Sequence, residues 1–338
     1  MNCSNNTTAI TRRTVGKGLL AVASVIVAPP TAWAQTKEVF PSRSVSLVVP
    51  MSPGGSTDQM ARSLAQRLTK TLGQPTVVEN KAGATGAIAA NFVARASGDG
   101  HTLLMAPSSV VVVNPLVSNV QYDIKRDFRP VGLFAVVETI IVASKKTGFQ
   151  TLADVISFAK KNPGKLTFGS NGIGSSFHLA GEFLQLLAGV ELLHVPYKGA
   201  APAEAALLAN EIDIAVTNTV SILPHIKSGA VTPIAILSSS RSPSRGLPQV
   251  PHASATLPGY VVDTWAGLYA PASTSTEVIL RLNTELNKFL LDPDSAEYLR
   301  TKGVEPAPGT PDDLVQFQEK ELAKWAKVVT AAKAAGRL

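Results

Sequence analysis

The sequence is nearly free of cysteine. Its single cysteine, Cys3, lies at the start of a chain of 338 residues. No apolar run reaches the length of about 18 residues that a membrane-spanning helix needs. If the N-terminal segment is removed, the mature chain has no disulfide and no thiol chemistry. A mature chain of about 300 residues can still bury a large core without disulfides.

Motifs that mark several classes of enzyme are also missing. The chain has no Gly-Lys-Ser/Thr after a Gly-rich turn, no Gly-x-Ser-x-Gly and no His-Glu-x-x-His. Its five histidines show no metal-ligand spacing. We therefore expect no nucleotide phosphate loop, no metal and no cofactor.

The N-terminus reads as an export signal. Residues 11–17 carry three basic side chains, including a pair of arginines, and a short apolar run follows over 18–28. Residues 32–34, Ala-Trp-Ala, form a small-x-small cleavage site. The pattern predicts a twin-arginine-like signal over 1–34, cleaved after Ala34, and a periplasmic location. A general secretory signal with two chance arginines is the alternative, and it also leads out of the cytoplasm.

Cleavage would also reduce the positive charge. The removed segment holds three basic residues and no acid, so the formal net charge falls from +7 to +4. The remaining basic residues are interspersed with acids and form no stripe with aromatic side chains. Together with export, this pattern argues against a nucleic-acid partner.

A Gly-rich turn over 50–58 is the most informative stretch of the mature chain. It joins an apolar strand-like run, 45–49, to a helix-like run that ends near Leu72. Its glycine pair lets the backbone turn sharply and approach a ligand closely. Ser56 or Thr57 can cap the helix, whose first N–H groups point back into the turn. Such a turn can bind an anion without a basic side chain, although it could also be an ordinary βα connection.

A second turn repeats this arrangement. Residues 166–176 again read as a strand, a Gly-rich turn, a serine cap and a helix start. Gly172 and Gly174 resemble part of a dinucleotide fingerprint, but Phe177 replaces its third glycine. Because ligands of open parallel sheets bind at the carboxyl ends of strands, the two turns suggest half-sites that face each other across a cleft.

The mature chain alternates between strand-like and helix-like runs. Strands are expected at 45–49, 76–79, 101–106, 131–137, 140–143, 166–169, 192–195, 212–216, 233–237 and 265–269, with helices between most of them and three helices at the C-terminal end. This alternation predicts an α/β protein with parallel sheets and helices on both faces. The irregular stretch 238–262 reads as a connection between domains.

A set of short motifs, in order, resembles the Bug-type extracytoplasmic solute receptors, the substrate-binding proteins of tripartite tricarboxylate transporters. The resemblance runs from about Val45 to the C-terminal helix. The motifs that carry it include Pro53-Gly54-Gly55-x-x-Asp58-x-x-Ala61-Arg62, Val78-Glu79-Asn80-Lys81-x-Gly83-x-x-Gly86, Asp99-Gly100-His101-Thr102-Leu103-Leu104, Gly172-x-Gly174-Ser175-x-x-His178 and His194-Val195-Pro196-Tyr197-Lys198-Gly199.

The resemblance implies a two-domain type II periplasmic binding protein, or "Venus flytrap", in which each domain is a sheet flanked by helices. Domain I would comprise 35–133 and 235–338, and domain II would comprise 134–234. The protein would be a monomer that closes over a small carboxylate and delivers it to the permease subunits of the transporter. Departures from the family pattern, such as Met51 where an aromatic residue is usual and Thr217-Asn218 where many members carry an acid, bear on the ligand rather than on the fold.

The candidate ligand-binding residues lie in the two turns and at other strand ends: Gly54, Gly55, Ser56, Thr57, Asp58, Ser108, Asn171, Gly174, Ser175, Ser176, Tyr197 and Asn218. The serines could instead only cap helices. Asp58 could accept a bond from a ligand amine or hydroxyl, or only support the helix dipole and its turn. We expect Arg62 to anchor the structure through an ion pair, and His178 and His194 to be core histidines.

The alternative function is an exported α/β hydrolytic or isomerising enzyme that acts on a small carboxylate. A Ser/His/Asp set could assemble from distant residues, for example Ser175, His178 and Asp213. No motif singles out such a set. A closed pocket lined by neutral donors suits binding better than turnover, so a receptor without enzymatic activity is the favoured interpretation.

Overall fold

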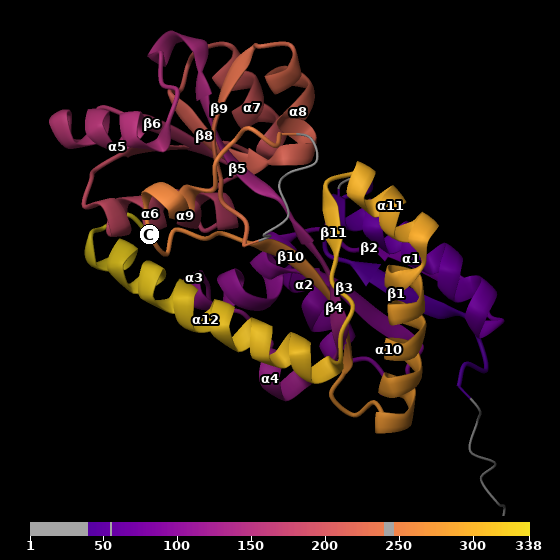
Figure 1. Ribbon diagram of the computed structural model, residues 1–338. Coiled ribbons are helices and arrows are strands. Elements are labelled where there is room, and N and C mark those ends of the chain that lie inside the picture. The colour runs from indigo at the N-terminus through magenta and orange to yellow at the C-terminus, as the bar shows by residue number, and fades with distance from the viewer. Residues whose placement is uncertain (1–39, 55, 240–246) are drawn as a thin grey trace, which may run out of the picture. The chain divides into compact units, whose positions relative to one another are not determined.

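The computed structural model describes residues 40–54, 56–239 and 247–338. The predicted export signal and the candidate residue Gly55 lie outside this part of the chain. The described residues form two β-sheets with helices packed against them (Figure 1). The predicted α/β class, with sheets flanked by helices, is confirmed.

The first sheet has six strands in the order β11-β4-β10-β3-β1-β2. The strands are β1 (Val45–Val49), β2 (Thr76–Asn80), β3 (Thr102–Pro107), β4 (Phe128–Val137), β10 (Thr264–Pro271) and β11 (Val304–Pro306). β1 pairs in parallel with β2 and β3, whereas β10 is antiparallel to β3 and β4, and β11 is antiparallel to β4.

The second sheet has five strands in the order β7-β6-β8-β5-β9. The strands are β5 (Thr139–Ser144), β6 (Thr167–Ser170), β7 (Leu193–Pro196), β8 (Ile214–Asn218) and β9 (Val231–Ile236). β6 pairs in parallel with β7 and β8, whereas β5 is antiparallel to β8 and β9.

Both sheets are therefore mixed, and the prediction of parallel sheets was wrong for part of each. A parallel pair needs a crossover connection, usually a helix. Glu138 alone separates β4 from β5, so the chain passes directly from one sheet to the other at that point. It returns through the segment after β9 and enters the first sheet as β10, which runs against both of its neighbours.

Alternation along the strands sends side chains to both faces of the first sheet. In β1, Leu47 and Val49 pack with the helix residues Leu64 and Leu286, whereas Val48 belongs to the cluster on the other face. The first face is covered by α1 (Ser56–Leu72), α10 (Thr276–Leu291) and α11 (Pro293–Thr301), and the second by α2 (Ala87–Ala94) and α12 (Pro311–Ala334).

The second sheet is organised in the same way. Ile140 and Val142 of β5 face one cluster, and Ile141 and Ala143 face another. Its helices are α5 (Leu152–Lys161), α6 (Ser176–Ala188), α7 (Ala200–Leu208) and α8 (Thr219–Lys227). Three shorter helices, α3 (Asn114–Val117), α4 (Ile124–Asp127) and α9 (Ala253–Thr256), lie in the connections.

Helix α12 connects the two sheets. It packs on β4 of the first sheet and against α6, which flanks the second sheet (Figure 1). The contact with α6 includes the rings of Trp325 and Phe183, whose centroids lie 6.0 Å apart. One apolar cluster therefore extends from the first sheet to the second.

The described residues offer neither a membrane-spanning helix nor a cluster of metal ligands. Within 40–54, 56–239 and 247–338, no helix is both long and apolar enough to cross a membrane. In the same residues, no three His, Cys, Asp or Glu side chains come together as in a metal site.

Candidate functional site

The first Gly-rich turn is held by the buried carboxylate of Asp58. Oδ2 accepts hydrogen bonds from the backbone N–H of Gly54, at 2.9 Å, and from Arg62 Nε, at 2.9 Å. Oδ1 accepts from Arg62 Nη2, at 3.0 Å, and from Asn80 Nδ2, at 2.9 Å. The Asp58 side chain is only 2% exposed. It thus ties the turn to α1 and to the end of β2, and the predicted ion pair of Arg62 is confirmed.

These contacts settle the charge of Asp58. Hydrogen bonds from Arg62 above all, with those from Gly54 and Asn80, lower the pKa of Asp58 to about 2, although burial opposes the shift. The carboxylate is therefore ionised at neutral pH with its oxygens occupied by the protein's own donors. The Gly54 amide is likewise engaged within the turn.

Ser108 lies buried at the end of β3, where the chain enters a π-helical turn, η2 (Ser109–Val113). Such turns occur frequently at functional sites. Asn114 follows the π-turn and donates from Nδ2 to the carbonyl of Thr85 at 3.3 Å. Ala84 and Thr85 have φ values of 46° and 53°, a conformation that non-glycine residues adopt only when neighbours enforce it. The segment after β3 thereby fixes the loop between β2 and α2.

The same segment reaches the second Gly-rich turn through Val117. Gly174 has a φ of 73°, and a Cβ there would lie 3.1 Å from Val117 Cγ2. The Gly174 N–H donates to His178 Nδ1, and Ser175 Oγ accepts from the His178 N–H, both at 3.1 Å. Ser175 is thus the N-cap of α6, as the sequence predicts.

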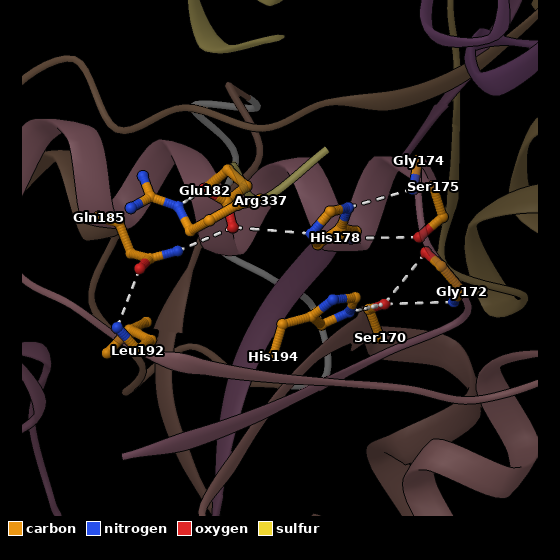
Figure 2. Close-up of polar contacts among 10 residues, drawn as sticks. All are labelled: Ser170, Gly172, Gly174, Ser175, His178, Glu182, Gln185, Leu192, His194 and Arg337. Atoms are coloured by element: carbon orange, nitrogen blue, oxygen red, sulfur yellow. Dashed lines mark hydrogen bonds and ion pairs between the residues drawn. The ribbon is translucent and has the colours of Figure 1, made fainter. Parts of the chain in front are cut away.

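A chain of buried polar contacts continues from this turn to the C-terminus (Figure 2). His178 Nε2 lies 3.6 Å from Glu182 Oε1, and Gln185 Nε2 donates to the same oxygen at 2.9 Å. Arg337 Nε donates to Glu182 Oε2 at 2.6 Å. Burial alone would raise the pKa of Glu182, but its contacts with His178 and Arg337 outweigh this effect and hold the pKa below its ordinary value. Glu182 is therefore a buried anion that Arg337 neutralises.

Of the two histidines beside this chain of contacts, His178 is a buried core residue, as predicted, and His194 is half-buried and packs against it. The rings of His178 and His194 stack with centroids 3.9 Å apart, and Ser170 Oγ lies 2.7 Å from His194 Nε2 (Figure 2). Burial, followed by repulsion from His178, lowers the pKa of His194 to about 4. His194 is therefore neutral at pH 7.

The Ser/His/Asp set of the enzyme interpretation is not assembled. The ring of His178 accepts from the Gly174 amide and faces Glu182, not a serine hydroxyl. Asp213 accepts bonds from the backbone N–H and the hydroxyl of Thr167, both at 2.8 Å, on another part of the second sheet.

A pocket of about 290 Å³ lies beside the first turn. It brings together Ser56, at the start of α1, and Asn218, at the end of β8. Elements of both sheets and their helices contribute to its lining, which includes Gln59, Val220, Tyr298 and Lys302. Two of the candidate residues that lie far apart in the sequence thus share one cavity.

Asn218 also lies where the chain passes between the sheets. Its Oδ1 lies 3.2 Å from Thr264 Oγ1, whose single hydrogen can be donated either to this oxygen or to the carbonyl of Val137, at 3.1 Å. The next amide, of Thr219, donates to the carbonyl of Glu138 at 3.0 Å. With Oδ1 engaged in this way, the amide nitrogen of Asn218 is the group that it can offer to a ligand.

The other described candidates do not line this pocket. Among the described residues, neither the second turn nor Tyr197 contributes to the lining. Thr57, Ser175 and Ser176 are buried, and Asn171 is exposed. The sequence missed Gln59, which occupies an unspecified position of the first motif, and Tyr298 and Lys302, because α11 and its C-cap carry none of the motifs.

Comparison with protein families finds one match. The family model described as the tripartite tricarboxylate transporter family receptor matches residues 60–333. A similar protein is BugT of Bordetella pertussis, which is 36% identical over 315 residues that cover 92% of this chain and 96% of BugT.

Solved structures with the same fold include two with bound ligands. Rpa4515 of R. palustris, determined with adipate, is 35% identical and has a TM-score of 0.78, covering 87% of this chain and 99% of that one. MatC (Rpa3494) of Rhodopseudomonas palustris, determined with bound malate, is 32% identical and has a TM-score of 0.74, covering 86% of this chain and 100% of that one.

Proposed function

We infer the function of this chain from the family to which it belongs, the tripartite tricarboxylate transporter receptors. The protein is a periplasmic solute-binding receptor that captures a small carboxylate for a transporter of this type. The solved relatives with adipate and malate support the same ligand class here. The observation that carries the proposal is the pocket in which Ser56 and Asn218, from elements of different sheets, face a common space.

The ligand would be held by side chains more than by the glycine amides. The amides of Gly54 and Gly174 are engaged by Asp58 and His178, so these glycines shape the turns. We propose that the Ser56 hydroxyl and the Asn218 amide group bind one carboxylate of the ligand. Neutral donors of this kind can replace water around an anion without a buried counter-ion.

The remaining candidates would complete the site when the protein closes. This set comprises Gly55, Thr57, Ser108, Asn171, Ser175, Ser176 and Tyr197, while Asp58 holds the first turn in place. Closure would be a hinge motion between domain I (35–133 and 235–338) and domain II (134–234). The strand connection at Glu138 and the segment after β9 would absorb it.

The protein would also have to be exported and to deliver its ligand to the transporter. Cleavage after Ala34 would release a monomer into the periplasm, and the liganded form would dock on the permease subunits of the transporter. The protein would not convert its ligand, so steady disappearance of the ligand with formation of a product would favour the enzyme interpretation.

We expect short aliphatic dicarboxylates to stabilise the protein in thermal unfolding. A ligand that binds only the folded state contributes about 1.4 kcal/mol at ten times its Kd. For a chain of this size, that contribution raises Tm by about 3 °C. Differential scanning fluorimetry with carboxylates and sugars measures the effect. A shift with sugars and with no carboxylate would contradict the proposal.

Asn218→Asp tests whether this pocket binds the carboxylate. It places a negative charge in the pocket and should reduce carboxylate affinity about tenfold. Gln316→Glu adds a comparable charge on the exposed face of α12, outside the pocket, and should leave affinity unchanged.

A further inference from the structure

The pocket beside the first turn contains one charged side chain among the described residues that line it, Lys302. Its Nζ lies 5.8 Å from the ring centroid of Tyr298, which also lines the pocket. Within the described chain, no carboxylate pairs with Lys302. The neighbouring cation, Arg300, is paired with Glu305 at 3.1 Å. Lys302 is therefore the cation of this segment whose charge is available to a ligand.

The rest of the lining does not compete for that charge. Met60, Val137 and Leu299 are apolar, and Ser56 and Asn218 are neutral. The buried carboxylate of Glu204 accepts the hydroxyl of the lining residue Ser221 at 2.6 Å. Its Oε1 also accepts a bond from Thr217 Oγ1, so this oxygen is occupied by two hydroxyl donors.

A close approach of Gly303, just after α11, to α8 brings Lys302 beside the pocket. Gly303 follows Lys302, and a Cβ at Gly303 would lie 2.2 Å from Val220 Cγ2 of α8. The absence of a side chain at Gly303 lets the end of α11 pack directly on α8, which begins just after Asn218. Lys302 thus shares a cavity with Ser56 of α1 and Asn218 of β8.

We propose that Lys302 is a specificity-determining residue that selects ligands with two carboxylates. One carboxylate would bind Ser56 and Asn218, and the ammonium of Lys302 would pair with the second. The apolar walls between them suit a short aliphatic chain. This inference rests on the proposed function, and it adds the side chain that distinguishes a dicarboxylate from a monocarboxylate.

The test is calorimetric titration with matched pairs of probes: succinate with butyrate, glutarate with pentanoate, and adipate with hexanoate. Each pair differs only in the second carboxylate. The wild-type protein should prefer the dicarboxylate about tenfold or more. Lys302→Gln should lower dicarboxylate affinity about tenfold and leave monocarboxylate affinity within about twofold, and Lys302→Glu should lower dicarboxylate affinity further.

Lys70→Gln provides the control, because Lys70 is exposed in the last turn of α1, about 20 Å along the helix from Ser56. It should change neither affinity. Unaltered dicarboxylate affinity in Lys302→Gln, or equal losses for both members of a pair, would overturn the inference and leave the proposed function standing. Failure of every carboxylate to bind the wild-type protein would overturn both.

Discussion

Replacing Arg337 with alanine is expected to lower the free energy of unfolding by about 3 kcal/mol at pH 7, because it leaves a buried carboxylate without its cation. Glu182 is 1% exposed, and Arg337 Nε donates to it at 2.6 Å. The second-to-last residue of the chain thereby stabilises a helix that flanks the second sheet. Urea denaturation measures this loss of stability. An unchanged m value, the slope of the unfolding free energy against urea concentration, would show that only stability has changed.

The double variant Glu182→Gln/Arg337→Ala is the informative control. The double variant removes the buried charge together with its cation, so it should recover most of the stability that Arg337→Ala loses. If the two substitutions acted independently, their losses of stability would add. If the single and double variants are equally stable, the ion pair is not the cause.

The pH dependence gives a further check on Arg337. The pKa of Glu182 is lowered in the folded state, so its stabilising contribution is present above the ordinary Glu pKa of about 4.3 and is lost as pH falls below it. The cost of Arg337→Ala should therefore shrink as pH decreases below about 4. A cost that grows on acidification would contradict this assignment.

The sequence predicted most of the fold because its signals are local. The apolar run Val45–Val49 and the serine cap of α6 each identify one element from a few neighbouring residues. The resemblance to Bug-type receptors, confirmed by the family match, supplied the α/β class and the receptor function. Strand direction was predicted less well, because β10 enters its sheet after a long irregular segment that carries no directional signal.

Two short elements were missed for a related reason. β11 has three residues, too few for alternation to be visible. The four consecutive valines over 110–113 have the β-branched side chains typical of a strand, yet they form a π-helical turn. In both cases tertiary contacts override the local preference.

The residues of the candidate site likewise fall into two groups, those that a local sequence signal identifies and those that only the fold brings together. Ser56 was predicted from its Gly-rich turn, and Asn218 from its place after an apolar strand. Lys302 joins the pocket where Gly303 approaches Val220 of α8, a contact between residues about 80 positions apart in the chain. No local pattern distinguishes Lys302 from any other exposed lysine, so the sequence could not single it out.

Asp58→Asn is expected to lower the free energy of unfolding by about 2 kcal/mol at pH 7, because an amide nitrogen would replace either Oδ2, which accepts from Gly54 and Arg62, or Oδ1, which accepts from Arg62 and Asn80. Asp294→Asn makes the same charge change at an exposed position in α11 and should alter stability by less than about 0.5 kcal/mol. Urea denaturation of both variants measures the difference. Equal, small effects would mean that the Asp58 network does not hold the turn.

The stability of Asp58→Asn should also depend on pH differently from that of the wild type. The pKa of Asp58 falls from 3.8 to about 2 in the folded protein, so its contribution is present above about pH 4 and is lost as pH falls towards 2. Its partner Arg62 is half-exposed, so the contribution from this shift is of the order of 1–2 kcal/mol rather than the full value for a buried pair. Asp58→Asn should flatten the stability profile in that window. A profile unchanged from the wild type would show that another group titrates there.

Ligand binding by Asp58→Asn separates support of the turn from direct recognition. In the folded protein the Asp58 carboxylate accepts four hydrogen bonds, which leaves it poorly placed to pair with a ligand amine. We therefore expect Asp58→Asn to change the affinities for glutamate and for its des-amino analogue, glutarate, by the same factor. Calorimetric titration of both ligands into both proteins tests this expectation. A loss of glutamate affinity at least tenfold greater than that of glutarate would instead place Asp58 in contact with the amine, because only glutamate carries the charge that the variant leaves unpaired.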